Sequence, residues 1–237
     1  MRKYLLMGLC GVVMGATGCR STVEMPPPLS LEPVNQLRVA ASAAALGMVR
    51  ADYYDPAIEL RPVYAGAGNA FGRVLYPEGF PMLLNRSTAL KLAMANGKLR
   101  KHGLRLQVLD AYRPPEVQWK MYQIYQSERY VSDPRTRWSK HTYGRAVDVT
   151  LVDADGRAVR MPSAFDDFSE RSAAAYTGPD AEVRSNVARL QSAMTAAGFT
   201  IYEAEWWHFN DLTNPAVFRG PPIFGRDLGL ALAPVPE

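Results

Sequence analysis

Two short segments, far apart in the chain, carry most of the metal-binding and acid–base side chains of this sequence. The first runs from Ser139 to Asp148 and contains His141, and the second runs from Glu205 to His208. The chain has only three histidines, and these segments hold two of them beside carboxylates. A catalytic zinc ion takes three protein ligands and keeps one position open. A fold that brings both segments together would supply a zinc site with one carboxylate to spare.

The expected ligands of one zinc ion are His141, Asp148 and His208, and Glu205 is the expected general base. Zinc would polarise the scissile carbonyl and activate a water, and the glutamate would take the proton from that water. The third histidine, His102, lies at the expected C-terminal end of a helix, where a positive charge is favourable, and we expect it to be structural. The pattern indicates a zinc peptidase.

The residues around the expected ligands predict how the backbone presents them. Residues 145–151 alternate in polarity and predict a strand with Asp148 on its polar face. A buried aspartate needs a partner, which a metal ion would provide; a polar face that is simply hydrated is the alternative. Aromatic residues around the second segment also favour a strand, but in a regular strand Glu205 and His208 would face opposite sides. We therefore expect a bulge or a strand end there.

The Ser-x-His-x-x-x-x-x-x-Asp and Glu-x-x-His segments resemble those of the zinc D-Ala-D-Ala dipeptidases, the group that includes the vancomycin-resistance enzymes. The Tyr-Arg-Pro segment at residues 110–114, the acidic segment at 165–172 and an N-terminal segment at 69–76 extend this resemblance, which runs from about residue 49 to residue 209. The ligand motif alone would also admit wall carboxypeptidases, endopeptidases and hedgehog-like domains. The Tyr-Arg-Pro and Phe-Asp-Asp segments favour the dipeptidase branch.

The resemblance also implies a role for residues outside the expected metal site. Arg113 would stabilise the tetrahedral intermediate, Asp166 would receive the substrate ammonium, and Ser139 would bind the substrate near its carboxylate. Asp167 is an alternative to its neighbour Asp166. Taken without the resemblance, Arg113 could be a surface arginine positioned by a Pro-Pro turn, and Asp166 a solvated turn or helix cap.

The resemblance implies an α+β fold, a single domain with helices flanking a mainly antiparallel sheet, although the alternation of helices and strands alone would also suit a parallel sheet. Expected helices cover residues 87–101, with Ser87 as N-cap, 115–130 and 181–197; expected strands cover 104–109, 145–151 and 202–209. The alanine-rich residues 39–46 suit either a tether or a short helix. The tail after Asn214 is rich in proline and is expected to pack loosely.

The N-terminus has the pattern of an export signal. Arg2 and Lys3 precede an uncharged span, residues 4–18, that is short for a membrane-spanning helix of ~20 residues. It ends in Ala-Thr-Gly-Cys, which resembles a bacterial lipoprotein processing site with Cys19 as the lipidated residue; a secretory signal without lipidation is the alternative. Acyl chains would then anchor the protein to a bacterial membrane. We expect an exported, periplasmic or envelope-facing lipoprotein.

The expected organisation has four parts. They are the signal peptide at residues 1–18, a lipidated N-terminus and Pro-rich tether at 19–38, the zinc dipeptidase domain at 39–214 and the C-terminal tail at 215–237. The only cysteines, Cys10 and Cys19, lie outside the expected domain, so a thiolate nucleophile or metal ligand is excluded there. The net charge of +4 is no evidence for a nucleic-acid partner.

We therefore expect an enzyme that hydrolyses D-Ala-D-Ala to two D-alanines. The first alternative is a D,D-carboxypeptidase or endopeptidase that acts on peptidoglycan stem peptides. The second is a wall-binding lipoprotein of the same fold that performs no hydrolysis. Glu205 argues against this last reading, because a structural metal site has no need of an unliganded base. The oligomeric state stays open.

Overall fold

The computed structural model describes residues 34–235, so the expected signal peptide, Cys19 and most of the expected tether lie outside the described residues. The main sheet contains, in spatial order, β2 (Glu59–Leu60), β4 (Leu104–Asp110), β5 (Ala146–Asp153), β7 (His208–Asn210) and β6 (Thr200–Ile201). Only the β2–β4 pair in this sheet is parallel. A separate antiparallel ribbon pairs β1 (Met48–Arg50) with β3 (Leu83–Asn85).

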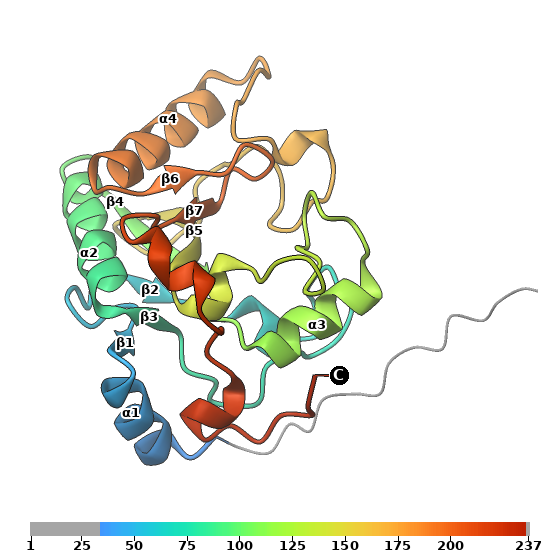
Figure 1. The fold of residues 1–237 in the computed structure, drawn as a ribbon. Coiled ribbons are helices and arrows are strands. Elements are labelled where there is room, and N and C mark those ends of the chain that lie inside the picture. Colours follow the sequence, from blue (N-terminus) through green and yellow to red (C-terminus); the bar gives the residue numbers. More distant parts are fainter. Residues whose placement is uncertain (1–33, 236–237) are drawn as a thin grey trace, which may run out of the picture.

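Helices flank this sheet, as expected for an α+β fold (Figure 1). The α-helices are α1 (Gln36–Ala45), α2 (Arg86–Arg100), α3 (Pro115–Ile124) and α4 (Ala181–Ala196). The 3-10 helices are η1 (Val63–Ala65), η2 (Lys140–Tyr143), η3 (Glu170–Ser172), η4 (Pro215–Arg219) and η5 (Gly225–Leu228). Helices α2 and α4 lie side by side and share an apolar core with β4 and β5. Among residues 34–235, no helix combines the length and apolar character needed to cross a bilayer.

Side chains from two apolar cores line the pocket described below. The first contains side chains of α2, α4 and the main sheet, and the second is rich in aromatic side chains such as Tyr64, Tyr76 and Tyr112. Phe165 packs against both cores. Because the interior of a folded protein is close-packed, contacts with both cores hold the lining segments in place without a disulfide.

Helix boundaries differ from the sequence-based expectation where local contacts compete. Helix α2 is capped by Asn85, whose Oδ1 accepts the backbone N–H of Ser87 at 3.1 Å, so the expectation of Ser87 as N-cap was wrong. Helix α3 ends at Ile124 rather than at residue 130. Its C-cap, Tyr125, is extended and stacks on Phe168 with ring centroids 4.6 Å apart. This aromatic contact draws the chain away from the helix axis.

The expected strand over residues 202–209 is wrong for most of its length, because residues 202–207 form a turn that joins β6 to β7. In that turn the backbone N–H of Glu205 donates to Tyr202 and that of Trp206 donates to Ser172. These bonds replace ladder bonds to a neighbouring strand. Strand β7 then begins at His208, which pairs directly with Asp148 of β5. The expected strand end between Glu205 and His208 is therefore confirmed.

Residues near both ends of the described segment, 34–235, pack more closely than expected. Helix α1 begins at Gln36, within the stretch expected to be tether, and its cap Asn35 accepts a backbone N–H. The expectation of a loosely packed C-terminal tail was wrong, because Leu228 and Leu230 are buried in the second core. The Tyr112 hydroxyl also donates to the backbone carbonyl of Ile223 at 2.8 Å.

Candidate metal centre and pocket

The backbone at residues 139–148 turns sharply and places His141 beside the start of β5. Ser139 caps η2 by accepting the backbone N–H of His141. Gly144 ends η2 with φ +62°, and a Cβ there would lie 3.1 Å from the backbone nitrogen of Asn85. Glycine is therefore required both by the left-handed conformation and by the close approach of β3.

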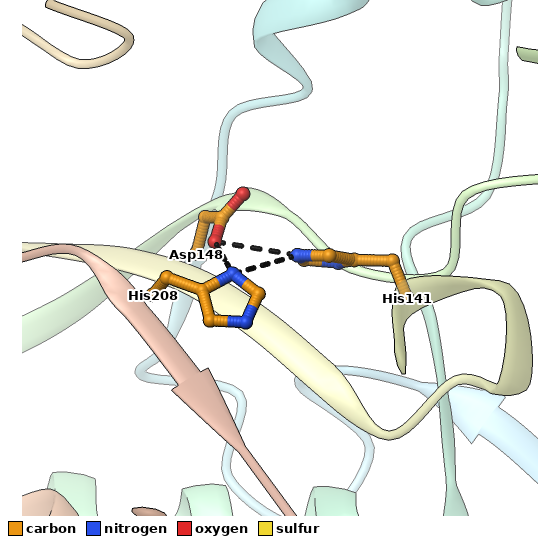
Figure 2. Close-up of side chains that lie close together, drawn as sticks. All are labelled: His141, Asp148 and His208. Atoms are coloured by element: carbon orange, nitrogen blue, oxygen red, sulfur yellow. Dashed lines mark hydrogen bonds and ion pairs between the residues drawn. The ribbon is translucent and has the colours of Figure 1, made fainter. Parts of the chain in front are cut away.

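Three side chains from separate elements converge at one point, as Figure 2 shows: His141 from η2, Asp148 from β5 and His208 from β7. His208 Nδ1 lies 3.0 Å from Asp148 Oδ1. His141 Nε2 lies 3.2 Å from His208 Nδ1 and 3.4 Å from the same carboxylate oxygen. Donors bound tetrahedrally about 2.0–2.1 Å from one zinc ion are separated by about 3.3 Å. The spacing of these donors therefore fits one metal ion.

The second nitrogen of each imidazole has its own hydrogen-bond acceptor. His141 Nδ1 lies 2.6 Å from the carbonyl oxygen of Ala111, so we assign the proton to Nδ1. His208 Nε2 lies 3.1 Å from Oδ1 of Asn210, so we assign its proton to Nε2. The lone pairs of His141 Nε2 and His208 Nδ1 are then directed to the shared point, as metal ligation requires. The signal for Asn210, two residues after a ligand histidine, was overlooked in the sequence.

Asp148 is buried, with 2% of its surface exposed. Burial raises the pKa of Asp148, but the charges and hydrogen bonds of His141 and His208 outweigh this effect and hold that pKa well below its ordinary value. The aspartate is therefore ionised and able to act as a ligand. Arg113 adds a positive charge 3.7 Å from the other carboxylate oxygen.

Glu205 lies beside the three donors rather than among them. Its Oε2 is 3.7 Å from His208 Nδ1, and its side chain is buried. Burial, followed by the negative charges of Asp148 and Asp166, raises the pKa of Glu205 well above its ordinary value. A hydrogen bond from Trp207 opposes the shift. A carboxyl group in this position can accept and release a proton close to the metal site.

Buried hydrogen bonds fix the side chain of Arg113, which lines the pocket. Its Nη2 and Nε donate to Asp110 Oδ2 at 2.8 and 3.0 Å, and its Nη1 donates to Gln118 Oε1 at 2.9 Å. The guanidinium lies over the ring of Tyr64, 5.5 Å from the centroid. Asp110 and Gln118 were not recognised from the sequence as supports of Arg113. The Asp-x-x-Arg spacing that precedes α3 is the signal that could have identified the first of them.

Asp166 lies on the pocket wall in a left-handed conformation with φ +56°. The hydroxyl of buried Tyr64 donates to its Oδ2 at 2.9 Å. Burial and the negative charge of Asp148 raise the pKa of Asp166 to about 8, against the opposing effects of Tyr64 and Arg113. The role of Tyr64 was missed, since a tyrosine about a hundred positions earlier gives no local signal. Asp167, the alternative to Asp166 in the sequence analysis, forms an ion pair with Arg171 at 2.5 Å.

A cavity of about 160 Å³ joins these groups, and it is lined by every candidate catalytic, substrate-binding and metal residue named from the sequence. They are Arg113, Ser139, His141, Asp148, Asp166, Glu205 and His208. Aromatic lining comes from Tyr64, Phe71, Tyr130, Trp138, Phe168, Tyr202 and Trp207. Drug-sized ligands occupy pockets of about 300–1,000 Å³, so this cavity suits a smaller molecule. His102 is exposed at the end of α2 and takes no part.

The chain is similar in sequence to one group of known peptidases. The family model described as "D-ala-D-ala dipeptidase", of the M15 peptidases, matches residues 44–219. The D-alanyl-D-alanine dipeptidase of Escherichia coli strain K12 is 34% identical over 154 residues, which cover 65% of this chain and 79% of that protein. The enzyme of that name from Enterococcus faecium is 43% identical over 72 residues, or 30% of this chain and 36% of the relative. One from Synechocystis is 31% identical over 122 residues, or 46% of this chain and 48% of the relative.

Proposed function

Because the chain belongs to the D-Ala-D-Ala dipeptidase family of metallopeptidases, we propose that it hydrolyses D-Ala-D-Ala to two D-alanines in a zinc-dependent reaction. The convergence of His141, Asp148 and His208 beside the unliganded Glu205 is the observation that carries this proposal. The small volume of the cavity supports a substrate as short as a dipeptide.

Zinc is the metal that the donor set favours, with one ion per chain. Two imidazoles and one carboxylate, each with the expected atom directed to the shared point, match catalytic zinc sites with three protein ligands. When bound there, zinc supplies a Lewis acid that polarises the scissile carbonyl and lowers the pKa of water. The buried surroundings limit access of other water to this point.

Glu205 is the proposed general base. Its carboxylate lies next to the ligand His208. From this position Glu205 can take a proton from the attacking water. It then delivers that proton to the amine of the leaving D-alanine. Because burial and two neighbouring carboxylates favour its protonated form, Glu205 can hold the proton between the two transfers.

The proposed roles of the other residues follow from charge and position. Arg113, held by Asp110, offers a fixed positive charge to the oxyanion that forms at the carbonyl, and comparable donors lower the barrier by about 3–4 kcal/mol. Asp166 offers a carboxylate to the substrate ammonium, and Ser139 offers a hydroxyl near the substrate carboxylate. A very small substrate is thereby recognised at both ends.

The test of function compares free D-Ala-D-Ala with a longer stem peptide, using protein of measured metal content. We expect about one zinc ion per chain and release of D-alanine from the free dipeptide. An L-Ala-L-Ala control tests stereochemical preference. Release of alanine from the longer peptide alone would instead identify a D,D-carboxypeptidase. Absence of release from any of them would identify a wall-binding protein without hydrolytic activity.

We also propose that the protein is exported and anchored to a bacterial membrane through acyl chains on Cys19. Support comes from the sequence pattern of residues 1–19 alone. Replacing Cys19 with serine should move the protein from the membrane fraction to the soluble fraction in the native host. Retention of the variant in the membrane fraction would contradict the anchor.

A further inference from the structure

One wall of the pocket carries two cations that the proposed mechanism does not use. Arg137 and Lys140 both line the cavity, on the segment that leads into His141. Neither forms an ion pair with any carboxylate in the described part of the chain. In contrast, Arg129, another lining residue, pairs with Glu170 at 3.3 Å. An unneutralised pair of cations in a pocket is a candidate site for an anion.

Packing holds Lys140 in place without neutralising its charge. Its Nζ lies 4.4 Å from the centroid of the Phe218 ring, a cation–π contact supplied by η4. The Phe218 ring is fixed in turn by an edge contact with Tyr143, with centroids 5.2 Å apart. Arg137 lines the same cavity three positions before Lys140. Because the two cations repel one another, an anion bound between them would be favoured.

The remaining charges of the pocket make this position complementary to a dipeptide. Asp148, Asp166 and Glu205 place three carboxyl groups in the catalytic part of the cavity, where a substrate ammonium and a metal ion would be bound. An extended chain advances about 3.5 Å per residue. Suppose that the ammonium of a dipeptide lies at Asp166 and its scissile carbonyl at the metal site. Its C-terminal carboxylate would then lie about one residue length beyond the metal site. Lys140 directly precedes the ligand His141 in the chain and lines the same cavity.

We propose that Arg137 and Lys140 bind the C-terminal carboxylate of the substrate and thereby select peptides that end one residue after the scissile bond. This inference rests on the proposed function and deepens it, because it supplies the charge that the Ser139 hydroxyl lacks. A charge-assisted hydrogen bond is worth more than a neutral one, and two donors on one carboxylate also fix its orientation.

The test removes both charges with the double variant Arg137→Gln/Lys140→Gln. The matched control, Lys98→Gln/Arg189→Gln, removes the same net charge from exposed positions on α2 and α4, outside this pocket. Both proteins are assayed on D-Ala-D-Ala and on D-alanyl-D-alaninamide, whose C-terminus is uncharged. We expect the pocket variant to lose roughly 10- to 100-fold in kcat/KM on the dipeptide. The loss should be in KM, since the carboxylate is bound alike in ground and transition states.

The amide substrate and the control variant should change by no more than about twofold. Equal losses on both substrates, or no loss on the dipeptide, would overturn the proposal. Arg137→Gln alone changes an exposed side chain and should shift the preference in the same direction without affecting folding. The charge-preserving Lys140→Arg variant should keep the preference, and its failure to do so would also count against the proposal.

Calorimetry separates this inference from the proposed function. Binding of the dipeptide and of its amide is measured on the zinc-loaded Glu205→Gln protein, with and without the Arg137→Gln/Lys140→Gln substitutions. If the wild-type protein fails to hydrolyse the dipeptide but binds its carboxylate through these two cations, the proposed function fails alone. If the wild-type protein hydrolyses the dipeptide but its preference for the dipeptide over the amide does not depend on Arg137 and Lys140, only the proposed carboxylate site is wrong.

Discussion

At the scale of single residues, the two ligand histidines depend on the groups that hold them. His208 meets the metal site through Nδ1 only while Nε2 keeps its proton, and the Asn210 amide oxygen at 3.1 Å is the acceptor that favours this tautomer. His141 uses a backbone carbonyl for the same purpose, which no side-chain substitution removes.

Asn210→Ala should therefore weaken zinc affinity by roughly 10- to 100-fold. The measurement is a competitive titration against a chromophoric chelator. Asn214→Ala, a change at an exposed position outside the pocket, is the control. An unchanged zinc affinity in Asn210→Ala would show that the imidazole of His208 is oriented by other contacts.

The raised pKa of Asp166 predicts that the stability of the metal-free protein depends on pH. Its pKa is raised from 3.8 to about 8 in the folded state. Between these values the folded protein keeps a proton that the unfolded chain has released, so this group makes stability fall as pH rises from about 4 to about 8. Asp166→Asn should raise Tm at about pH 8 by on the order of 5 °C, and by much less at about pH 5. Asp167→Asn is the neighbouring control, and an equal gain at both pH values would contradict the account.

The sequence identified the residues whose chemistry is unusual and not those that support them. His141, Asp148 and His208 could be found because imidazoles and a strand aspartate at such spacing have few other uses. Tyr64 and Gln118 could not, since a tyrosine or glutamine is common and its partner is set by the fold. Contacts of this kind, between residues far apart in the chain, leave no local pattern.

At the scale of secondary structure, the register of β5 against β7 places two of the ligands. Asp148 and His208 are paired directly, and a slip by one residue would turn one of these side chains to the opposite face. Asp211, the residue after β7, is fully buried and secures this end of the strand. It accepts hydrogen bonds from Lys91 and Thr88 of α2, each at 2.7 Å.

Asp211→Ala should lower the free energy of unfolding by about 3–5 kcal/mol, because it leaves Lys91 and Arg145 without their buried carboxylate. Burial raises the pKa of Asp211, but the hydrogen bonds from Lys91, Thr213 and Thr88 outweigh this and lower it to about 2. The contribution is thus complete above about pH 4 and lost as pH falls through about 2. Urea denaturation measures the change. Asp155→Ala, which removes an exposed ion pair, should cost under about 1 kcal/mol, and a similar cost for both variants would refute this view.

Helix ends could be predicted where the capping signals are local. Helix α4 matches its expected span because Asp180 caps its start and Gly198, with φ +93°, follows its end. The end of α3 could not be predicted, since it depends on the packing of Tyr125 against Phe168. The same limit explains why residues 202–209 were expected as one strand: β-propensity does not report a turn fixed by tertiary bonds.

At the scale of the whole molecule, side chains from both cores line the site, so metal binding and folding are coupled. The donors come from η2, β5 and β7, which the unfolded chain does not hold together. Proline-rich composition wrongly predicted a loose tail, because buried Leu228 and Leu230 anchor it to the second core. Apolar residues within such a segment decide its packing, and their burial depends on the complete fold.

Removal of the metal should therefore lower Tm. Zinc at about a thousand times its dissociation constant stabilises the folded state by about 4 kcal/mol, or on the order of 10 °C for a domain of this size. Differential scanning fluorimetry before and after chelation measures the change, and added zinc should restore the original Tm. A His208→Ala variant should show no such response. A zinc-independent Tm in the wild-type protein would contradict a metal site built from these three elements.

The central claim is that three side chains hold a zinc ion while Glu205 moves the proton. The most direct test measures D-Ala-D-Ala turnover and bound zinc in the same preparation of the Glu205→Ala variant. We predict that kcat falls by at least about 100-fold, since general acid–base catalysis contributes 10²–10⁴-fold, while the zinc content stays near that of the wild-type protein. Turnover that survives the substitution, or loss of zinc together with activity, would contradict the account.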